Sequence, residues 1–392
     1  MMHMKVFLLT SSLHDERMVD HGSRVFLDSL GMEYELGKPD FSDYGTGRPD
    51  LIYVRTGGTE GLFRQFFPSL GNGPFYLLTS GESNSLAASM EILSWLNSQG
   101  IRGEIIHGPT SYVRERIALL EKVETVRARL SGRRYGVIGK PSDWLISSQA
   151  DYDAVQERMG ISLVDIPMER LVGKLHSVKG TSDVEEGAMR IYDALKEIVA
   201  EERLNGFTLR CFDLLDKVRN TGCLALAKLN SEGIVAGCEG DVPAMLSMAL
   251  SDAVTGVSGF QANPASIDLD TGKIIFAHCT IPLNMVRSYS FSTHFESGLG
   301  IGIHGEMEEG TVTILKMSGA VDRMFVQEAL LEGNQYEKNL CRTQLVLRIP
   351  EPLRRAVLGD YFLRNPIGNH HIIVPGAWAE VFEAYFRSVS QK

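Results

Sequence analysis

Residues 233–246 read GIVAGCEGDVPAML, and the rest of the chain is interpreted outward from this stretch. It begins with an apolar run, and two acidic residues, Glu239 and Asp241, follow that run in a loop. Pro243 then opens a helix at the position where its missing N–H does no harm. One interpretation is that Asp241 caps this helix and that Glu239 meets a Lys or Arg. The other is a functional site, because buried carboxylates are usually paired, hydrogen-bonded or bound to a metal.

On the N-terminal side of this stretch, short apolar strands alternate with helical segments, first before residue 130 and again from residue 135. Strands separated by helices indicate βαβ units and mainly parallel sheets. From about residue 284 the pattern changes to alternating hairpins, which predicts an antiparallel β-domain. The predicted domains are an α/β domain at 1–132, a second α/β domain at 133–284 that carries Glu239, and a β-domain at 285–392 that carries His370.

The composition is that of a soluble globular protein, with 44% hydrophobic and 22% charged residues in a chain of 392. A formal net charge of -10 without a visible Lys/Arg stripe argues against a nucleic-acid partner. No apolar segment approaches the roughly 18 residues of a membrane span. The apolar run after Lys5 is too short for the core of a signal peptide. We therefore expect a cytoplasmic protein with neither a nucleic acid nor a membrane as partner.

Five cysteines without a CxxC pair suit a reducing compartment and buried thiols. Cys238 stands beside Glu239, and Cys279 stands beside His278. One interpretation of these two pairs is thiolate chemistry or a zinc site. The alternative is that the cysteines are small apolar fillers next to a site, since free Cys is among the most buried residue types.

Three loops at the carboxyl ends of predicted strands carry polar side chains, and ligands of parallel sheets bind at such ends. Arg55 follows one strand together with a Gly pair and hydroxyls, and Glu82 and Asn84 follow the next. Trp144 lies in the third loop, where an aromatic face suits the apolar face of a sugar ring. None of the loops has the spacing of a Walker loop or a GxGxxG fingerprint, so a nucleotide is not supported. Turn and capping chemistry, or burial of Trp144 in a turn, are the alternatives.

Glu239, the polar loop near Asn263, His278 and the pair His370–His371 also lie at the edges of apolar strands. Each His alone is more often a hydrogen-bonded structural residue than a ligand. Together the four supply carboxylate, amide and imidazole, a set that suits a borderline or hard divalent ion such as manganese. We therefore expect a divalent metal, with Mn2+ as the best match.

The order of these motifs resembles the L-fucose isomerase and L-arabinose isomerase superfamily, and above all its shorter fucose-isomerase-like members. The resemblance rests on CEGD at 238–241 before a helix, FAHC at 276–279, a Gly-rich β-domain and GNHH at 368–371. It covers most of residues 135–376. It implies two Rossmann-like parallel-sheet α/β domains followed by an antiparallel β-barrel-like domain. It also implies a homo-oligomer, a trimer or hexamer, with a manganese site near a subunit interface.

By this resemblance, Glu239 is the metal-binding carboxylate that also acts as base, and His370 is a late imidazole ligand. His278 matches a histidine that binds metal in arabinose isomerases but not in fucose isomerases, and we group it with the substrate contacts. Where fucose isomerases have a metal-binding aspartate, this chain has Asn263, which can coordinate through its oxygen but cannot take a proton. Asp268 is the nearest carboxylate that would compensate as a second catalytic acid, although its surroundings also suit a turn.

These observations predict a metal-dependent aldose–ketose isomerase that acts on a free monosaccharide, fucose-like, arabinose-like or related, through an ene-diolate. A metal across the two sugar oxygens would stabilise the developing charge, and Glu239 would move the proton between C1 and C2. Arg55, Glu82, Asn84 and Trp144 would contact hydroxyls and the ring. The alternatives are a non-catalytic sugar-binding or regulatory protein, and a metal-dependent hydrolase or aldolase that uses the same ligands.

Overall fold

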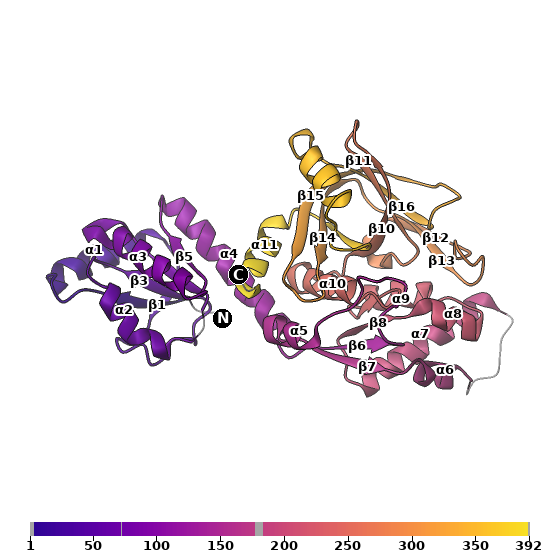
Figure 1. The fold of residues 1–392 in the computed structure, drawn as a ribbon, viewed down its shortest axis with the longest axis horizontal. Helices are drawn as coiled ribbons and strands as arrows, with labels where there is room; N and C mark the ends of the chain where they lie inside the picture. The colour runs from indigo at the N-terminus through magenta and orange to yellow at the C-terminus, as the bar shows by residue number, and fades with distance from the viewer. Residues whose placement is uncertain (1–3, 72, 177–182, 391–392) are drawn as a thin grey trace. The chain divides into compact units, whose positions relative to one another are not determined.

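The computed structural model describes residues 4–71, 73–176 and 183–390, and Figure 1 labels its helices and strands. The chain divides into two compact units, one up to Thr125 and the other from Val126 onward. Among the described residues, no helix is both long enough and apolar enough to cross a membrane. The predicted domain boundaries at residues 132 and 284 stay predictions.

The N-terminal unit is built on a five-stranded parallel sheet in the order β2-β1-β3-β4-β5. Alternate residues of β3 face opposite sides, so that Tyr53 packs into one core and Ile52 into another. Burial on both faces explains why its strands read as continuous apolar runs. The elements are β1 (Met4–Leu9), α1 (Glu16–Ser29), β2 (Tyr34–Leu36), β3 (Asp50–Val54), α2 (Glu60–Phe66), η1 (Phe67–Ser69), β4 (Phe75–Leu78), η2 (Glu82–Asn84), α3 (Ser85–Ser98), β5 (Gly103–Ile106) and α4 (Thr110–Leu130).

The second unit begins with a four-stranded parallel sheet in the order β7-β6-β8-β9. Apolar side chains of four helices, such as Leu195 and Leu214, cover this sheet. They form one core with side chains of the strands, such as Phe207. The elements are β6 (Arg134–Ile138), α5 (Tyr152–Met159), β7 (Ser162–Ile166), α6 (Met168–His176), α7 (Val184–Glu201), β8 (Gly206–Leu209), α8 (Cys211–Val218), α9 (Cys223–Ser231), β9 (Val235–Gly237) and α10 (Val242–Thr255).

A closed antiparallel barrel follows in the order β10-β11-β16-β15-β14-β17. It begins at Phe260, ahead of residue 284, because β10 and β11 pair with the later strands β17 and β16. The barrel and the two parallel sheets confirm the predicted fold class. The elements are β10 (Phe260–Asp268), β11 (Lys273–His278), η3 (Leu283–Met285), β12 (Ser288–Ser292), β13 (Gly302–Glu306), β14 (Gly310–Met317), β15 (Met324–Gln335), β16 (Thr343–Arg348), η4 (Glu351–Leu353), the π-helix η5 (Arg355–Phe362), β17 (His371–Pro375) and α11 (Ala379–Val389).

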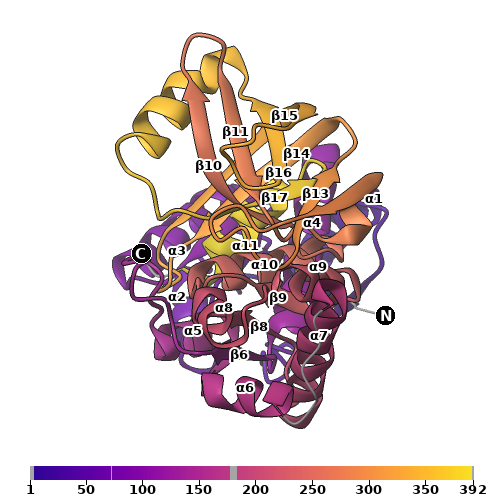
Figure 2. The ribbon, with the colours of Figure 1, turned by 90° about the vertical axis from the view of Figure 1, so that its right-hand side faces the viewer.

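Helix α10 joins the second parallel sheet to the barrel. Its side chains are buried on nearly all sides, as expected for a helix that is apolar all round. It packs against β8 and β9 of the sheet and against β10, β14 and β17 of the barrel. The loop that precedes it, residues 238–241, therefore lies where the sheet and the barrel meet (Figure 2).

Candidate active site

Glu239 lies in the turn between β9 and α10. Its backbone has a φ of 61° and that of Gly240 has a φ of 64°, so two successive residues are left-handed. A sparsely populated backbone conformation costs about 1–3 kcal/mol and is concentrated at functional sites. At position 240 a Cβ would lie 3.0 Å from the backbone nitrogen of Ser142, which leaves room only for glycine. The turn thus fixes the Glu239 carboxylate between the sheet and the barrel.

Asp241 connects the start of α10 to the barrel. Its Oδ1 accepts a hydrogen bond from the Ala244 N–H at 2.8 Å, so the capping interpretation is confirmed. Its Oδ2 lies 3.0 Å from His370 Nδ1 and 3.4 Å from Lys316 Nζ. The side chains of Asp241, His370 and Lys316 are all almost fully buried. One carboxylate therefore caps a helix, pairs with a buried ammonium group and orients an imidazole.

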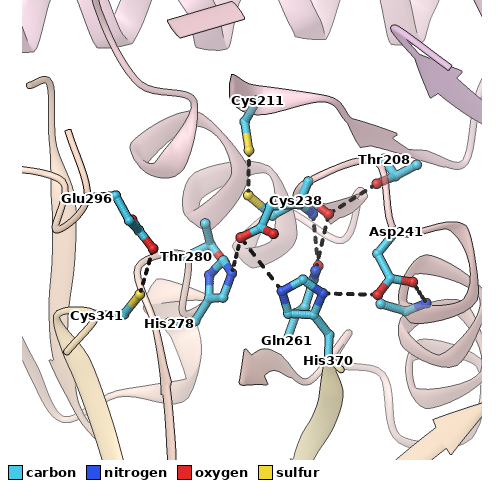
Figure 3. Close-up of polar contacts among 12 residues, drawn as sticks. Thr208, Cys211, Cys238, Asp241, Gln261, His278, Thr280, Glu296, Cys341 and His370 are labelled. Atoms are coloured by element: carbon cyan, nitrogen blue, oxygen red, sulfur yellow. Dashed lines mark hydrogen bonds and ion pairs between the residues drawn. The ribbon is translucent and has the colours of Figure 1, made fainter. Parts of the chain in front are cut away.

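Two histidines of the barrel meet the carboxylate of Glu239 (Figure 3). His278 Nε2 lies 3.3 Å from Glu239 Oε1, and Thr280 Oγ1 lies 3.0 Å from the other ring nitrogen of His278. His370 Nε2 lies 3.7 Å from the same Glu239 oxygen, and this buried nitrogen has no hydrogen-bond partner within the described ranges. The interpretation in which Glu239 meets a Lys or Arg is wrong for the residues that the structure describes, since its ion-pair partners there are imidazoles.

The charges of this cluster are set by burial and by close partners. Burial opposes the charge on Glu239, but His370 and His278 outweigh it and hold its pKa well below the usual value. For Asp241, Lys316 and His370 likewise overcome burial and lower the pKa to about 2. Burial disfavours the imidazolium form of His370, yet Glu239 and Asp241 raise its pKa to about 9. Both acids are therefore ionised at neutral pH, whereas His370 without a cation is protonated and would release its Nε2 proton when it binds one.

Gln261 on β10 holds the same turn from the barrel side. Its Oε1 accepts a hydrogen bond from the Cys238 N–H at 2.8 Å, and its Nε2 donates to the Cys238 carbonyl at 3.1 Å. Sequence reasoning missed both Gln261 and Lys316. The available signal was a polar side chain between two apolar neighbours, Phe260 and Ala262 around Gln261 and Leu315 and Met317 around Lys316, because a buried polar group needs a partner.

Asn263 reaches this region along β10. Asn263 pairs with Ala277 on β11 and lies two residues after Gln261, so its side chain is on the same face of β10 as the Gln261 side chain that holds the turn. Its Oδ1 is buried and has no hydrogen-bond partner in the described part of the chain. Buried polar atoms without a partner call for an explanation such as an ion or a water. Asn263 Oδ1, His370 Nε2 and the Glu239 carboxylate are donors of the kinds that a divalent cation with oxygen and imidazole ligands accepts.

A cavity of about 190 Å³ opens beside this cluster and is lined by the loop 144–148, Asp241, Lys316 and Asn369. Trp144 is 40% exposed, so the interpretation of a Trp buried in a turn is wrong. The Arg210 guanidinium lies 4.9 Å from the centre of its ring. The structure therefore places the partly exposed Trp144 in the lining of the same cavity as Asp241.

The other predicted substrate contacts belong to the N-terminal unit. Arg55 and Glu82 line a cavity of about 300 Å³ at the carboxyl ends of that unit's strands. Arg55 is buried and bonded to Thr10 and Asp20. Asn84 precedes α3 with a left-handed backbone, and its side chain makes no capping hydrogen bond within the described residues. A role of Arg55, Glu82 and Asn84 in substrate binding stays a prediction.

Asp268 lies at the turn of the β10–β11 hairpin. Its carboxylate accepts hydrogen bonds from two backbone N–H groups of that turn, as the turn interpretation expected. Asp268 pairs with Lys273, whereas His278 is at the other end of β11, roughly 16 Å away at the usual rise of a strand. The structure therefore does not bring Asp268 to Glu239 within the chain.

No protein-family model matches the chain. Among curated proteins, it is 28% identical over 184 residues to the sulfoquinovose isomerase of Clostridium sp. (strain MSTE9), covering 43% of this chain and 39% of the relative. It is 22% identical over 230 residues to that of Alkalicoccus urumqiensis, covering 52% of each. It is 21% identical over 235 residues to that of Priestia megaterium, covering 54% of this chain and 53% of the relative. The chain spans about half the length of the curated relatives that it matches, and these relatives carry the name of a sugar isomerase.

Proposed function

We propose that this protein is an aldose–ketose isomerase of the L-fucose and L-arabinose isomerase superfamily that acts on a free monosaccharide. The observation that carries the proposal is the alignment of Asp241, His370 and Glu239. The buried Asp241 carboxylate holds His370 Nδ1 in place, and His370 Nε2 faces the Glu239 carboxylate. This Nε2 has no hydrogen-bond partner in the described part of the chain. The name shared by the curated relatives supports the same reaction class.

We propose that Glu239, Asn263 and His370 hold a divalent cation, most suitably Mn2+. Metal-bound histidines almost always donate their other N–H to a carboxylate or carbonyl, and Asp241 occupies that position here. Carboxylate, amide and imidazole ligands favour manganese over softer ions. When bound, such a cation would stabilise the negative charge that develops on the two sugar oxygens during isomerisation.

In this proposal Glu239 moves the proton between C1 and C2 of the sugar. Its described contacts use Oε1, which leaves Oε2 for the substrate. His278 holds the carboxylate in place through Oε1, and the left-handed turn at Glu239 and Gly240 keeps it from rotating away. Positioned acid–base catalysis of this kind contributes about 10²- to 10⁴-fold to the rate.

The cavity beside Asp241 suits the non-reacting part of a sugar. The ring of Trp144 offers an apolar surface, and Lys316 and Asn369 offer hydrogen-bond donors. Fucose-like and arabinose-like sugars are candidates by the resemblance of motifs, and sulfoquinovose is a candidate by the names of the relatives. We propose further that the enzyme is a homo-oligomer with this site near a subunit interface.

Proton NMR in deuterium oxide tests the proposal directly. The chelator-treated protein is incubated with a panel of pentoses, hexoses, deoxy-sugars and sulfoquinovose, with and without Mn2+. Deuterium uptake at C2 of one aldose, with its ketose appearing only when the metal is present, is the expected result. Cleavage products would favour a hydrolase or aldolase, and a sugar that binds without exchange would favour a binding protein.

A further inference from the structure

All five cysteines of the chain lie near the Glu239 turn or the strands that face it. Cys211 at the start of α8 and Cys238 at the end of β9 bring their sulfur atoms to 3.1 Å (Figure 3). Cys279 follows His278 and hydrogen-bonds with Cys341. The proposed isomerase reaction uses none of these thiols.

The sulfur of Cys238 lies close to a carboxylate oxygen of Glu239 and a ring nitrogen of His278, as the ligands of a metal ion do. The ligand atoms of Cys238, Glu239 and His278 all lie within 4.8 Å of one another. Ligands around a tetrahedral zinc ion lie about 3.3–3.8 Å apart, given usual Zn–N and Zn–S bond lengths. The three atoms therefore need to approach by at most about 1–1.5 Å. The Cys211 sulfur is outside this group, but it lies 3.1 Å from that of Cys238 and is the nearest candidate for a fourth ligand.

The surroundings of this set resemble those of a metal site. His278 offers Nε2 toward Glu239, and its Nδ1 is held by Thr280 at 3.0 Å, the kind of outer contact that fixes a metal-binding imidazole. The backbone of Cys238 is clamped on both sides by Gln261, so its side chain starts from a fixed point. Cys238 itself is 3% exposed, which limits competition from water.

We infer that Cys238, Glu239 and His278, joined by Cys211 when an ion binds, form a second cation site, one that takes a thiophilic divalent ion such as zinc. Thiolate ligands select zinc and softer ions, whereas the set of Glu239, Asn263 and His370 suits manganese. Glu239 belongs to both sets, so an ion held by the thiols takes up the carboxylate that the proposed isomerase reaction needs. Under the proposed function, zinc therefore acts as an inhibitor at this position.

Cobalt is the probe, because thiolate bound to Co2+ gives a near-ultraviolet charge-transfer absorption that oxygen and imidazole ligands do not give. The full-length protein, stripped of metal and kept reduced, is titrated with Co2+ and then with Zn2+. A charge-transfer band that saturates at one Co2+ per chain and is bleached by zinc is expected. This readout needs no sugar turnover, so it stands or fails independently of the isomerase proposal.

Cys→Ser variants identify which thiols bind the ion. Cys238→Ser should remove the band and weaken zinc binding by more than about 100-fold, since loss of an outer partner alone costs 10–100-fold. Cys211→Ser should leave about half of the band, and it serves as the test if Cys238→Ser does not fold by circular dichroism. Cys341→Ser is the matched thiol control, and Asn263→Ala is the control for the manganese set, and both should keep the band. Absence of a thiolate band in the unmodified protein, its survival in folded Cys238→Ser or its loss in Cys341→Ser would overturn the inference.

Discussion

Asp241 Oδ2 lies 3.0 Å from His370 Nδ1, although the two residues are 129 positions apart in the chain. The contact joins the N-cap of α10 to the residue just before β17, and α10 is the helix that packs against both the parallel sheet and the barrel. Lys316 on β14 approaches the same oxygen at 3.4 Å. The stability of the second unit and the orientation of the proposed metal ligand therefore depend on one carboxylate.

Replacing Asp241 by Asn should affect both stability and metal binding. The buried Lys316 ammonium would lose its counter-charge, and breaking a buried ion pair from one side costs about 3–5 kcal/mol of unfolding free energy. The His370 imidazole would lose the acceptor that orients it, which should weaken Mn2+ binding by about 10- to 100-fold. Urea unfolding and calorimetric titration with Mn2+ measure the two effects separately.

The double variant Asp241→Asn/Lys316→Met separates these causes. It removes the unpaired ammonium group together with its partner, so it should recover part of the lost stability. It does not restore an acceptor for His370, so Mn2+ affinity should stay as low as in Asp241→Asn. An Asp241→Asn protein that binds Mn2+ as tightly as the unmodified protein would show that the carboxylate does not support a metal ligand.

Glu239→Gln should abolish deuterium exchange at C2 while leaving the fold intact. The amide keeps the shape of the side chain but cannot accept the proton, and the expected loss in kcat is at least about 10²-fold. Asp268→Asn is the matched control, because its carboxylate serves the β10–β11 turn and should leave exchange nearly unchanged. NMR exchange rates and circular dichroism of both variants provide the comparison. Exchange retained in Glu239→Gln would reject its role as base.

The order of elements along the chain was accessible from the sequence because it depends on local periodicity. Apolar runs between helices predicted the parallel sheets, and alternation after residue 284 predicted the antiparallel part. The start of the barrel was missed. Phe260 and its neighbours form a local hairpin with β11, but the pairing that makes them part of the barrel is with β17, more than 100 residues away, and that pairing leaves no local signal.

Part of the candidate site was predictable because three of its residues adjoin apolar strands that local periodicity reveals. Glu239, His278 and His370 each follow or begin an apolar strand, and the structure brings these three together. Asp268 was grouped with them because it is near Asn263 in the sequence. Along an extended strand, however, a separation of a few residues becomes a large distance, and its backbone contacts hold it in the turn.

Position 263 should control the affinity for Mn2+. The Asn263 oxygen is buried and without a hydrogen-bond partner among the described residues, so it is available as a neutral ligand. Asn263→Asp adds a charged ligand and should tighten Mn2+ binding about tenfold, whereas Asn263→Ala should weaken it, since metal affinity is tuned by ligand charge and number. Titration followed by the electron paramagnetic resonance of free Mn2+ measures both. Equal affinities in Asn263→Asp, Asn263→Ala and the unmodified protein would exclude position 263 from the metal site.

Asp252 should make the second unit less stable as the pH rises from acidic to neutral. It lies in the last turn of α10, and burial raises the pKa of its carboxyl above the usual value, with Arg133 and Arg129 opposing this shift only in part. As the pH rises, the unfolded chain therefore loses this proton before the folded protein does, and stability falls. The negative end of the helix dipole adds to the cost of the charge.

Asp252→Asn removes that charge and should raise the unfolding free energy at pH 7 by more than the roughly 0.3–1 kcal/mol expected for an exposed charge at the wrong helix end, because burial adds to the cost of the charge. The gain should vanish near pH 3, where the carboxyl is protonated in both states. Asp216→Asn is the matched control, because Asp216 is also in the last turn of a helix, α8, but is exposed. Urea unfolding of the three proteins at both pH values gives the comparison. A gain of the same size at pH 3 and pH 7 would mean that the substitution acts through packing, and a gain no larger than that of Asp216→Asn would assign it to the helix dipole alone.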